Sequence, residues 1–328
     1  MDKPLSVLYS SKVAKTAALR KDEYFMSKQM RANLLLVLTA LIWGVAFVAQ
    51  DVAAEAVPPM YFNGLRMSLA ALAILPTVWM MDRRAVGNKA YGLAWKQMSK
   101  AQKKELLIGG TWCGVLLTLG STSQQFGLSM GASAGKAGFV TAMYIVLVPL
   151  AGIFWRRRIG WMVWVAVVLS TAGLYFLCMQ GSFQVAFSDV LLLACAIAYT
   201  AHILVVDHFS RHTDCVKMSL IQFAVTAILC LAGGILFESL SLSAVVSCII
   251  PIAYAGILSA GAGYTLQILA QRDAEPAIAS LLMSMESVFA VLAGWVILGD
   301  ALSTRELLGC VLMMGGIVLA QLPQKEKV

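Results

Sequence analysis

Long apolar segments separated by short polar ones run through almost the whole chain. Ten such segments lie at about 33–52, 60–81, 106–126, 137–155, 161–179, 188–206, 218–237, 249–270, 277–298 and 306–322. Each has about the 17 to 25 residues that a helix needs to cross a hydrocarbon core of roughly 30 Å. Because backbone groups inside a bilayer must pair within the protein, the pattern predicts ten transmembrane helices. No segment alternates like the strands of an outer-membrane barrel.

The two halves of this pattern repeat each other. The stretch Lys136–Arg158 aligns without a gap with Ile278–Asp300, 142 positions later. The same offset pairs Gly114 with Gly256, Gln125 with Gln267, and Gly173 with Gly315. We therefore expect a first five-helix repeat at 33–180 and a second at 181–322, with tails at 1–32 and 323–328.

Composition fits a polytopic membrane protein. Of the 328 residues 60% are hydrophobic and 13% are charged, with a mean hydropathy of +0.80, which leaves too little polar surface to coat a water-soluble globule. The net charge of +8 sits in the connections between apolar segments. It therefore carries topology information and does not indicate a nucleic-acid partner.

The basic residues fix an expected orientation. All 25 Lys and Arg except Arg66, Lys136 and Arg305 lie in the tails or in the connections at 82–104, 156–158, 207–217 and Arg272. By the positive-inside rule these parts are cytoplasmic, with both termini inside. Since five helices per half is an odd number, the second repeat must be inverted relative to the first. Such inverted repeats are typical of secondary transporters, whose substrate site lies near the membrane midplane.

Motifs for enzymatic chemistry are missing from the sequence. The seven cysteines stand singly without a CxxC, so neither a zinc site nor a disulfide framework is indicated. P-loop, HExxH and Gly-x-Ser-x-Gly motifs do not occur. The run from His202 to Asp207 looks like an acyltransferase His-x4-Asp, but five helical residues turn about 500° and separate the two side chains. We expect no enzyme, no cofactor and no metal.

Four stretches resemble the drug/metabolite transporter superfamily, in its bacterial EamA-type ten-helix branch. They are LIWGVAFVAQD from Leu41, PPMYFNGLRMSLAAL from Pro58, QQFGLSMGASAGKAGFVTAMYIVLVPL from Gln124, and SVFAVLAGWVILGD from Ser287. The resemblance implies ATP-independent transport across the inner membrane, usually efflux of amino acids, other metabolites or toxic analogues. It also places Arg66 at the family's arginine position. Two positions depart from the pattern: Arg158 replaces an acidic residue, and Ser287 replaces a proline.

Ionisable residues inside membrane helices are costly and are therefore functional candidates. Arg66 can pair with a substrate carboxylate or with a neighbouring acid such as Asp51, although snorkelling or holding a helix interface would also explain it. Glu286, the repeat equivalent of Tyr144, can exchange a proton or meet a substrate amine, and hydrogen bonding to a neighbouring helix is its structural alternative. Asp51 is a second candidate for proton coupling. Lys136 is expected to be an interfacial anchor near the extracellular face.

Uncharged polar and aromatic residues complete the expected cavity. Gln125 and Gln267 form a repeat-related pair of amides that either grip substrate or join helices. Tyr144 offers an apolar face and a hydroxyl, and His202 is expected to line the cavity or bond between helices. Weaker candidates of the same kind are Trp43, Asn63, Tyr199 and Tyr264.

The sequence thus predicts a ten-helix secondary transporter that exports amino acids or similar small amphipathic metabolites across the bacterial inner membrane by alternating access. Its partners would be a small-molecule substrate and the lipid bilayer, with monomer and homodimer both open. Uptake or facilitated diffusion of a sugar-like or nucleotide-linked solute is the alternative within transport, and a membrane-embedded transferase or a sensor is the alternative outside it. Met1, Met26 and Met30 are the candidate translation starts.

Overall fold

A computed structural model describes residues 5–86, 93–132, 134–154, 159–179, 186–293, 295–296 and 303–322. Within these ranges the elements are helices and no strand occurs. Nine helices of the described part are long and apolar enough to cross a membrane. Many large apolar side chains, such as Leu72, Val168 and Ile235, point outward. The protein is therefore an all-helical, multi-pass membrane protein.

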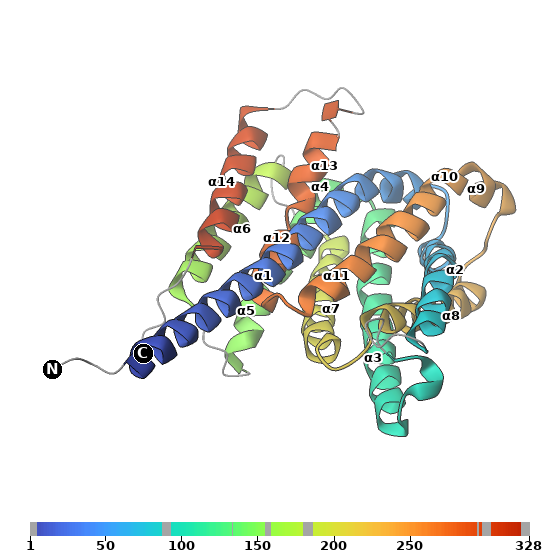
Figure 1. Cartoon of the computed structure of the whole chain (residues 1–328). Helices are drawn as coiled ribbons and strands as arrows, with labels where there is room; N and C mark the ends of the chain where they lie inside the picture. The colour runs from blue at the N-terminus through green and yellow to red at the C-terminus, as the bar shows by residue number, and fades with distance from the viewer. Residues whose placement is uncertain are drawn as a thin grey trace.

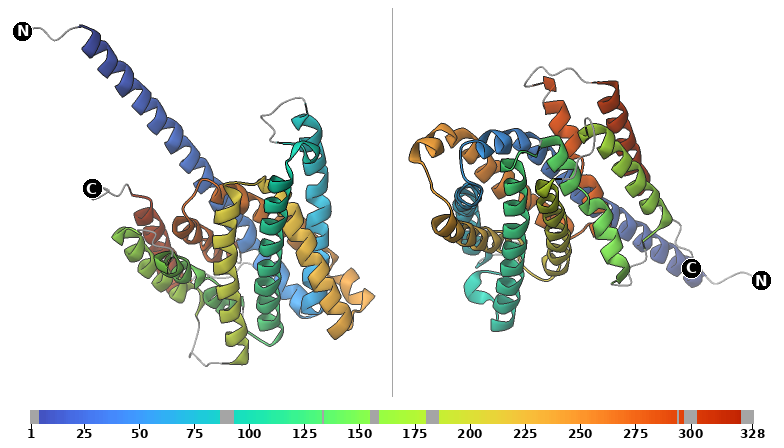
Figure 2. Two further views of the ribbon diagram at one scale, coloured as in Figure 1. Left: turned by 90° about the horizontal axis from the view of Figure 1, so that it is seen from below. Right: turned by 180° about the vertical axis from the view of Figure 1, so that it is seen from behind.

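The first half contains five membrane-length helices. They are α1 (Leu5–Ala54), α2 (Pro59–Ala85), α3 (Lys100–Ser129), the pair α4 (Ala134–Thr141) and α5 (Tyr144–Phe154), and α6 (Trp161–Cys178), with a short 3-10 turn η2 (Trp95–Gln97) before α3. The expected N-terminal tail is helical from Leu5 and continues into the first apolar segment without interruption. This part of α1 projects beyond the rest of the bundle (Figure 2).

The second half is more interrupted. It contains α7 (Phe187–Ser210), α8 (Cys215–Phe237), α9 (Leu242–Ser247), α10 (Ile249–Ala253), the π-helix η3 (Tyr254–Tyr264), α11 (Thr265–Gln271), α12 (Pro276–Met283), α13 (Glu286–Ala293) and α14 (Thr304–Ala320). The last of these, at 17 residues, corresponds to the tenth predicted segment. It lies against α6 at one side of the bundle (Figure 1).

Two apolar segments that the sequence presents as single helices are broken in the middle. Turns at 142–143 separate α4 from α5, and turns at 284–285 separate α12 from α13, so the two breaks are 142 positions apart. At the first break Met143 N donates to Val140 O at 3.2 Å, and at the second Met285 N donates to Leu282 O at 3.2 Å. These i to i−3 bonds tighten the turn and shift the direction of the following helix. Neither break is marked by Gly or Pro, which is why the sequence pattern does not reveal it.

The π-helix η3 has no counterpart in the first half, where α3 is a continuous α-helix. Wide π turns are rare and leave carbonyl groups available to other donors. One such carbonyl, Ser259 O, accepts a hydrogen bond from Trp43 Nε1 at 3.0 Å. The π-helix η3 therefore forms part of the wall of the central cavity.

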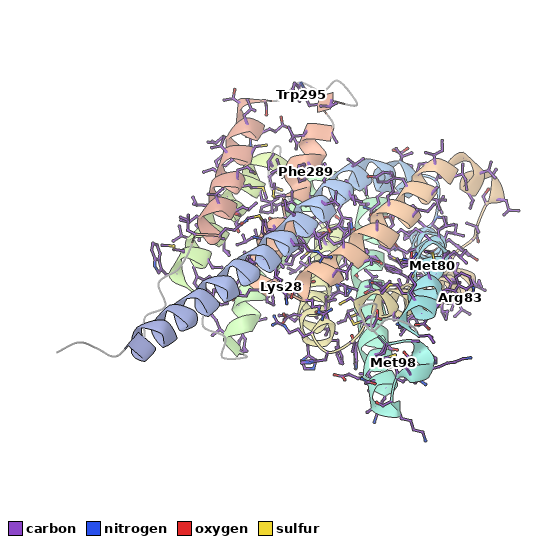
Figure 3. The ribbon with its side chains drawn as sticks, in the orientation of Figure 1. Lys28, Met80, Arg83, Met98, Phe289 and Trp295 are labelled. Atoms are coloured by element: carbon purple, nitrogen blue, oxygen red, sulfur yellow. The ribbon has the colours of Figure 1, made fainter. Side chains whose placement is uncertain are left out.

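Helix packing follows the repeat. The helices α2 and α8 pack on each other, and so do α6 and α14. In the first half α3 packs on α7, and in the second half η3 packs on α1 in the same way. Likewise, the broken helix of α4 and α5 packs on α7, and the broken helix of α12 and α13 packs on α1. Met98, ahead of α3, and Trp295, beyond α13, lie at opposite ends of the bundle (Figure 3). The broken helices and the first helix of each half thus meet at the centre.

Candidate functional site

A cavity lies at this centre, among α1, α2, α3, the broken helices, α7, η3 and α11. It is lined by Trp43, Phe47, Gln50, Arg66, Gln124, Thr141, Tyr144, Tyr199, His202, Ile203, Ser259, Tyr264, Gln267, Met283 and Glu286. Eight of the ten residues that the sequence singles out as cavity candidates are among them. No residue of α6 or α14 appears in the lining. The helices of the fifth and tenth predicted segments therefore lie outside the cavity wall.

Tyr144 and Glu286 are in direct contact in the cavity wall. Tyr144 Oη donates to Glu286 Oε1 at 3.2 Å. Each is the first residue of the helix that follows a break, α5 for Tyr144 and α13 for Glu286. Glu286 is buried, and this hydroxyl is its hydrogen-bond donor among the described side chains. A buried carboxyl beside a single neutral donor is costly to ionise and is placed to bind a proton or a cation.

Close backbone contact fixes the position of Glu286. A Cβ on Gly44 of α1 would lie 2.6 Å from Glu286 O and 2.8 Å from Ala290 N. Only a glycine lets α1 approach the start of α13 this closely. The glycine therefore keeps Glu286 at the wall formed by α1.

Arg66 supplies the positive charge of the cavity. It lies two turns into α2, is only 2% exposed, and donates from Nη1 to Gln50 Oε1 at 3.0 Å. Its Nε has no hydrogen-bond partner among the described residues, and its guanidinium lies 5.4 Å from the Phe62 ring centroid. A guanidinium held by a neutral amide keeps donors available for an anion. The side chain of Asp51, the acid that the sequence suggests as its partner, lies outside the described residues.

Aromatic residues form another part of the cavity wall. Trp43 and Tyr264 are in contact with ring centroids 4.8 Å apart, and Tyr264 Oη donates to Tyr199 Oη at 3.3 Å. His202 meets Tyr264 edge on at 6.0 Å and pairs through Nε2 with Gln222 Oε1 of α8 at 3.1 Å. Aromatic faces with polar edges suit a solute that is partly apolar and partly polar.

The amides are arranged differently from the sequence prediction. Gln267 lines the cavity, donates to Gln271 Oε1 at 2.8 Å, and leaves its own Oε1 without a partner in the described part of the chain. Its repeat equivalent Gln125 is buried outside the lining and donates to Gln50 O at 3.3 Å. The neighbouring Gln124 lines the cavity in its place and bonds Thr141 Oγ1 at 3.4 Å. Successive helical residues are about 100° apart, so the rotation of α3 decides which glutamine faces inward.

Asn63 also lies outside the cavity lining. Its Nδ2 donates to Ser121 O at 3.0 Å and so connects α2 with α3. Thr141, Gln50 and Ser259 are lining residues that sequence reasoning missed. Thr141 precedes a break, and Ser259 contributes a carbonyl from the π-helix. The fourth missed polar residue is Gln124, and the apolar ones are Phe47, Ile203 and Met283.

Other residues singled out from the sequence have local partners. Lys136 Nζ forms an ion pair with Asp189 Oδ2 at 2.7 Å, which joins α4 to α7. His202 is directed to α8, whereas Asp207 pairs with Arg211 at 2.7 Å, so the two groups of the apparent His-x4-Asp have separate partners. Arg158 and Asp300, the last residues of the two aligned stretches, lie outside the described residues.

The cavity is small in this structure. Its volume of about 50 Å³ accommodates only a few water molecules, since one water requires roughly 10–15 Å³ on this measure. Its lining combines one cation, one carboxyl, several amides and hydroxyls, and an aromatic wall. Such a lining offers hydrogen-bond donors, a carboxyl group and apolar faces to a small solute.

Comparison with known proteins agrees with this architecture. A chain from Archaeoglobus fulgidus named an uncharacterized transporter is 26% identical over 90% of this chain and 87% of its own length. The uncharacterized transporters YoaV and YwfM of Bacillus subtilis are 21% and 25% identical, over 88% and 90% of this chain. A solved crystal structure superposes with a TM-score of 0.71 at 20% identity, over 89% of this chain and 96% of that one, which shows a shared fold.

The family assignment rests on both halves of the chain. The model of the EamA-like transporter family matches residues 30–179 and again residues 186–322. Together these matches span most of the 328 residues and agree with the internal repeat. The chain belongs to the EamA-like transporter family.

Proposed function

We propose that this protein is a secondary transporter that exports amino acids or similar small amphipathic metabolites across the bacterial cytoplasmic membrane. In this proposal α14 is the tenth span, the two repeats are inverted, and both termini are cytoplasmic. Transport proceeds by alternating access to the central cavity. The observation that carries the proposal is the hydrogen bond between Tyr144 and Glu286.

These two residues occupy the same position in the two repeats. A residue meets its own equivalent only near the axis that relates the repeats. In an inverted repeat that axis lies in the plane of the membrane, so the contact belongs at the midplane. A buried carboxyl at this depth is the kind of group that transporters use to bind protons or cationic parts of substrates.

The ends of the helices support the proposed topology. Asn33 Nδ2 of α1 donates to Gln321 Oε1, directly after α14, at 3.0 Å. The beginning of the first predicted span and the end of the tenth therefore lie at one face, which an even number of spans requires. The concentration of Lys and Arg in the connections on this side favours the cytoplasm.

The substrate class follows from the charges of the cavity. Arg66 offers donors to a carboxylate, and Glu286 offers a carboxyl to an amine. Trp43, Tyr199 and Tyr264 offer apolar faces to the remainder of the solute. An amino-acid-like zwitterion satisfies both charges at once, whereas a solute with only one charge leaves the other uncompensated.

The test is a transport assay with purified protein in proteoliposomes. Loaded amino acids, nucleosides, sugars and cationic dyes are followed with and without an imposed pH gradient, and counterflow in both orientations separates export from uptake. We expect at least one amino-acid-like solute to move faster than in empty liposomes. If no solute of these classes moves above that control, the transport proposal is wrong.

A further inference from the structure

The helices α2 and α8 form a tight antiparallel pair between the two repeats. Near the start of α2, a Cβ on Gly64 would lie 2.7 Å from Leu231 of α8. Near the end of α8, a Cβ on Gly233 would meet the Met60 side chain, and one on Gly234 would lie 3.1 Å from the Tyr61 ring. Small residues at such contacts let two membrane helices pack along their backbones.

One end of this pair is closed by Glu238. The helix α2 begins at Pro58 and Pro59, which provide no capping side chain. Glu238, at the end of α8, supplies the cap: its carboxylate accepts from Met60 N at 2.9 Å and from Tyr61 N at 3.0 Å. The negative charge also lies at the positive end of the α2 dipole. A carboxylate from the second repeat thus holds the first turn of a helix of the first repeat.

The opposite end is closed by Asp82. This residue lies in the last turn of α2, and its Oδ1 is 3.0 Å from Nζ of Lys217, in the first turn of α8. The Lys217 side chain is 5% exposed and also contacts Asp214 Oδ2 at 2.7 Å and Leu93 O at 3.0 Å. A buried ammonium ion with three acceptors is fully compensated, and loss of one acceptor is costly. A carboxylate from the first repeat thus holds the first turn of a helix of the second.

The two contacts are equivalent by the repeat. Asp82 and Glu238 are 156 positions apart, and so are Tyr61 and Lys217. The glycine contacts give the same register independently. A Cβ on Gly114 would lie 2.9 Å from Gln222 O and 2.7 Å from Val225 Cβ, and a Cβ on Gly256 would lie 2.9 Å from Arg66 O and 2.7 Å from Leu69 Cβ. Arg66 therefore corresponds to Gln222, again 156 positions later.

This register shows which residues of α2 and α8 contact the lining of the cavity. Arg66 and Gln222 are equivalent residues on the two clamped helices, and each bonds a residue of the preceding helix, Gln50 and His202 respectively. Both of those partners line the cavity. Any slip of α2 along α8 would move Arg66 out of the cavity wall. By contrast, the breaks at 142–143 and 284–285 give the helices that carry Tyr144 and Glu286 a place to bend.

We propose that Asp82 and Glu238 are positioning residues that clamp α2 to α8 at the two ends of the pair throughout the transport cycle. The clamps make α2 and α8 one rigid unit, which keeps Arg66 in place while the broken helices move around it. This inference rests on the proposed transport function, because a transport cycle is needed for other helices to move.

The experiment introduces reversible cross-links at the two clamps. The variants are Tyr61→Cys with Glu238→Cys at one end and Asp82→Cys with Lys217→Cys at the other, each treated with a short thiol cross-linker cleavable by reduction. The comparison variant is Lys136→Cys with Asp189→Cys, which joins α4 to α7 across a broken helix. We expect either clamp cross-link to leave most of the transport rate, and the comparison cross-link to stop transport until it is reduced.

Loss of transport on cross-linking either clamp, with recovery on reduction, would show that α2 and α8 separate and would overturn the clamp. A single substitution adds a second test: Glu238→Gln should raise the KM for the solute that the wild type carries, and Glu238→Asp should restore it. Unchanged KM in Glu238→Gln would also count against the inference. If the wild type moves no solute, the transport proposal fails by itself. The clamp is then tested by the yield of each cross-link. This yield should stay high for Tyr61→Cys with Glu238→Cys and for Asp82→Cys with Lys217→Cys when each solute is added.

Discussion

Tyr144 Oη and Glu286 Oε1 lie 3.2 Å apart although the two residues are 142 positions apart in the chain. They are the first residues of two helices that begin after equivalent breaks, so the contact joins the two repeats in the cavity wall. The carboxyl of Glu286 therefore lies in direct contact with both repeats.

We expect Glu286→Gln to remove the response of transport to an imposed pH gradient, because the amide keeps the shape but cannot exchange a proton. Tyr144→Phe is the matched control. It removes one hydrogen bond, worth about 0.5–1.5 kcal/mol, and should leave the response to the gradient in place. Initial rates in proteoliposomes with and without the gradient measure both. A wild-type gradient response in Glu286→Gln would exclude this residue as the proton carrier.

Arg66→Gln should weaken binding of carboxylate-bearing solutes by roughly tenfold to a hundredfold, since a charge-assisted hydrogen bond contributes about 1.5–3 kcal/mol. The affinity is measured as the ligand-induced shift in unfolding temperature over a range of solute concentrations. Arg305→Gln, at an exposed arginine in the first turn of α14 that lies over Tyr175, serves as the control and should bind normally. Equal affinity in Arg66→Gln and wild type would remove Arg66 from the substrate site.

Gly263→Ala should destabilise the protein by about 1–3 kcal/mol, the usual cost of overpacking. The new Cβ would lie 2.5 Å from Trp43 Nε1, so the indole must move away from Ser259 O. Gly315→Ala, where the added Cβ has no atom within 4 Å among the described residues, should be neutral or stabilising by up to roughly 1 kcal/mol. Thermal unfolding in detergent compares the two. Equal unfolding temperatures would contradict the close contact at Gly263.

The proposed topology predicts that two exposed residues, Ser243 and Lys96, lie on opposite sides of the membrane. Ser243→Cys in α9 should react with a membrane-impermeant maleimide in intact cells, whereas Lys96→Cys in η2 should react only after permeabilisation. The native cysteines of the described chain are buried or partly buried, so wild-type protein gives the background. The reverse pattern would invert the orientation, and labelling of both from outside would contradict the inverted repeat.

Much of the fold was predictable because a bilayer restricts the choice. A segment of about 20 apolar residues must pair its own backbone, so apolar length alone identifies helices such as α6 and α8. The 142-residue offset, which is visible in the sequence alone, also identifies Tyr144 and Glu286 as equivalent residues. Burial cost made Arg66 and Glu286 candidates for the site, and the structure brings both to one cavity.

Other features depended on the tertiary structure. The repeat offset changes from 142 in α3 to α6 to 156 in α2, because the connection at 86–99 is longer than its counterpart before α9. The equivalences of Arg66 with Gln222 and of Asp82 with Glu238 are therefore invisible to a gapless alignment. They emerge from the contacts of Asp82 and Glu238 and, independently, from those of Gly114 and Gly256.

Hydrophobic length and burial cost are local properties of the chain, so the amino-acid pattern alone predicts a helical membrane protein with an internal repeat and a small set of costly buried groups. Three features come from packing instead: the places where helices break, the choice between Gln124 and Gln125 at the cavity wall, and the carboxylates that join α2 to α8. These depend on how each helix is rotated and how closely glycines allow it to approach its neighbours, and packing between segments far apart in the chain sets both.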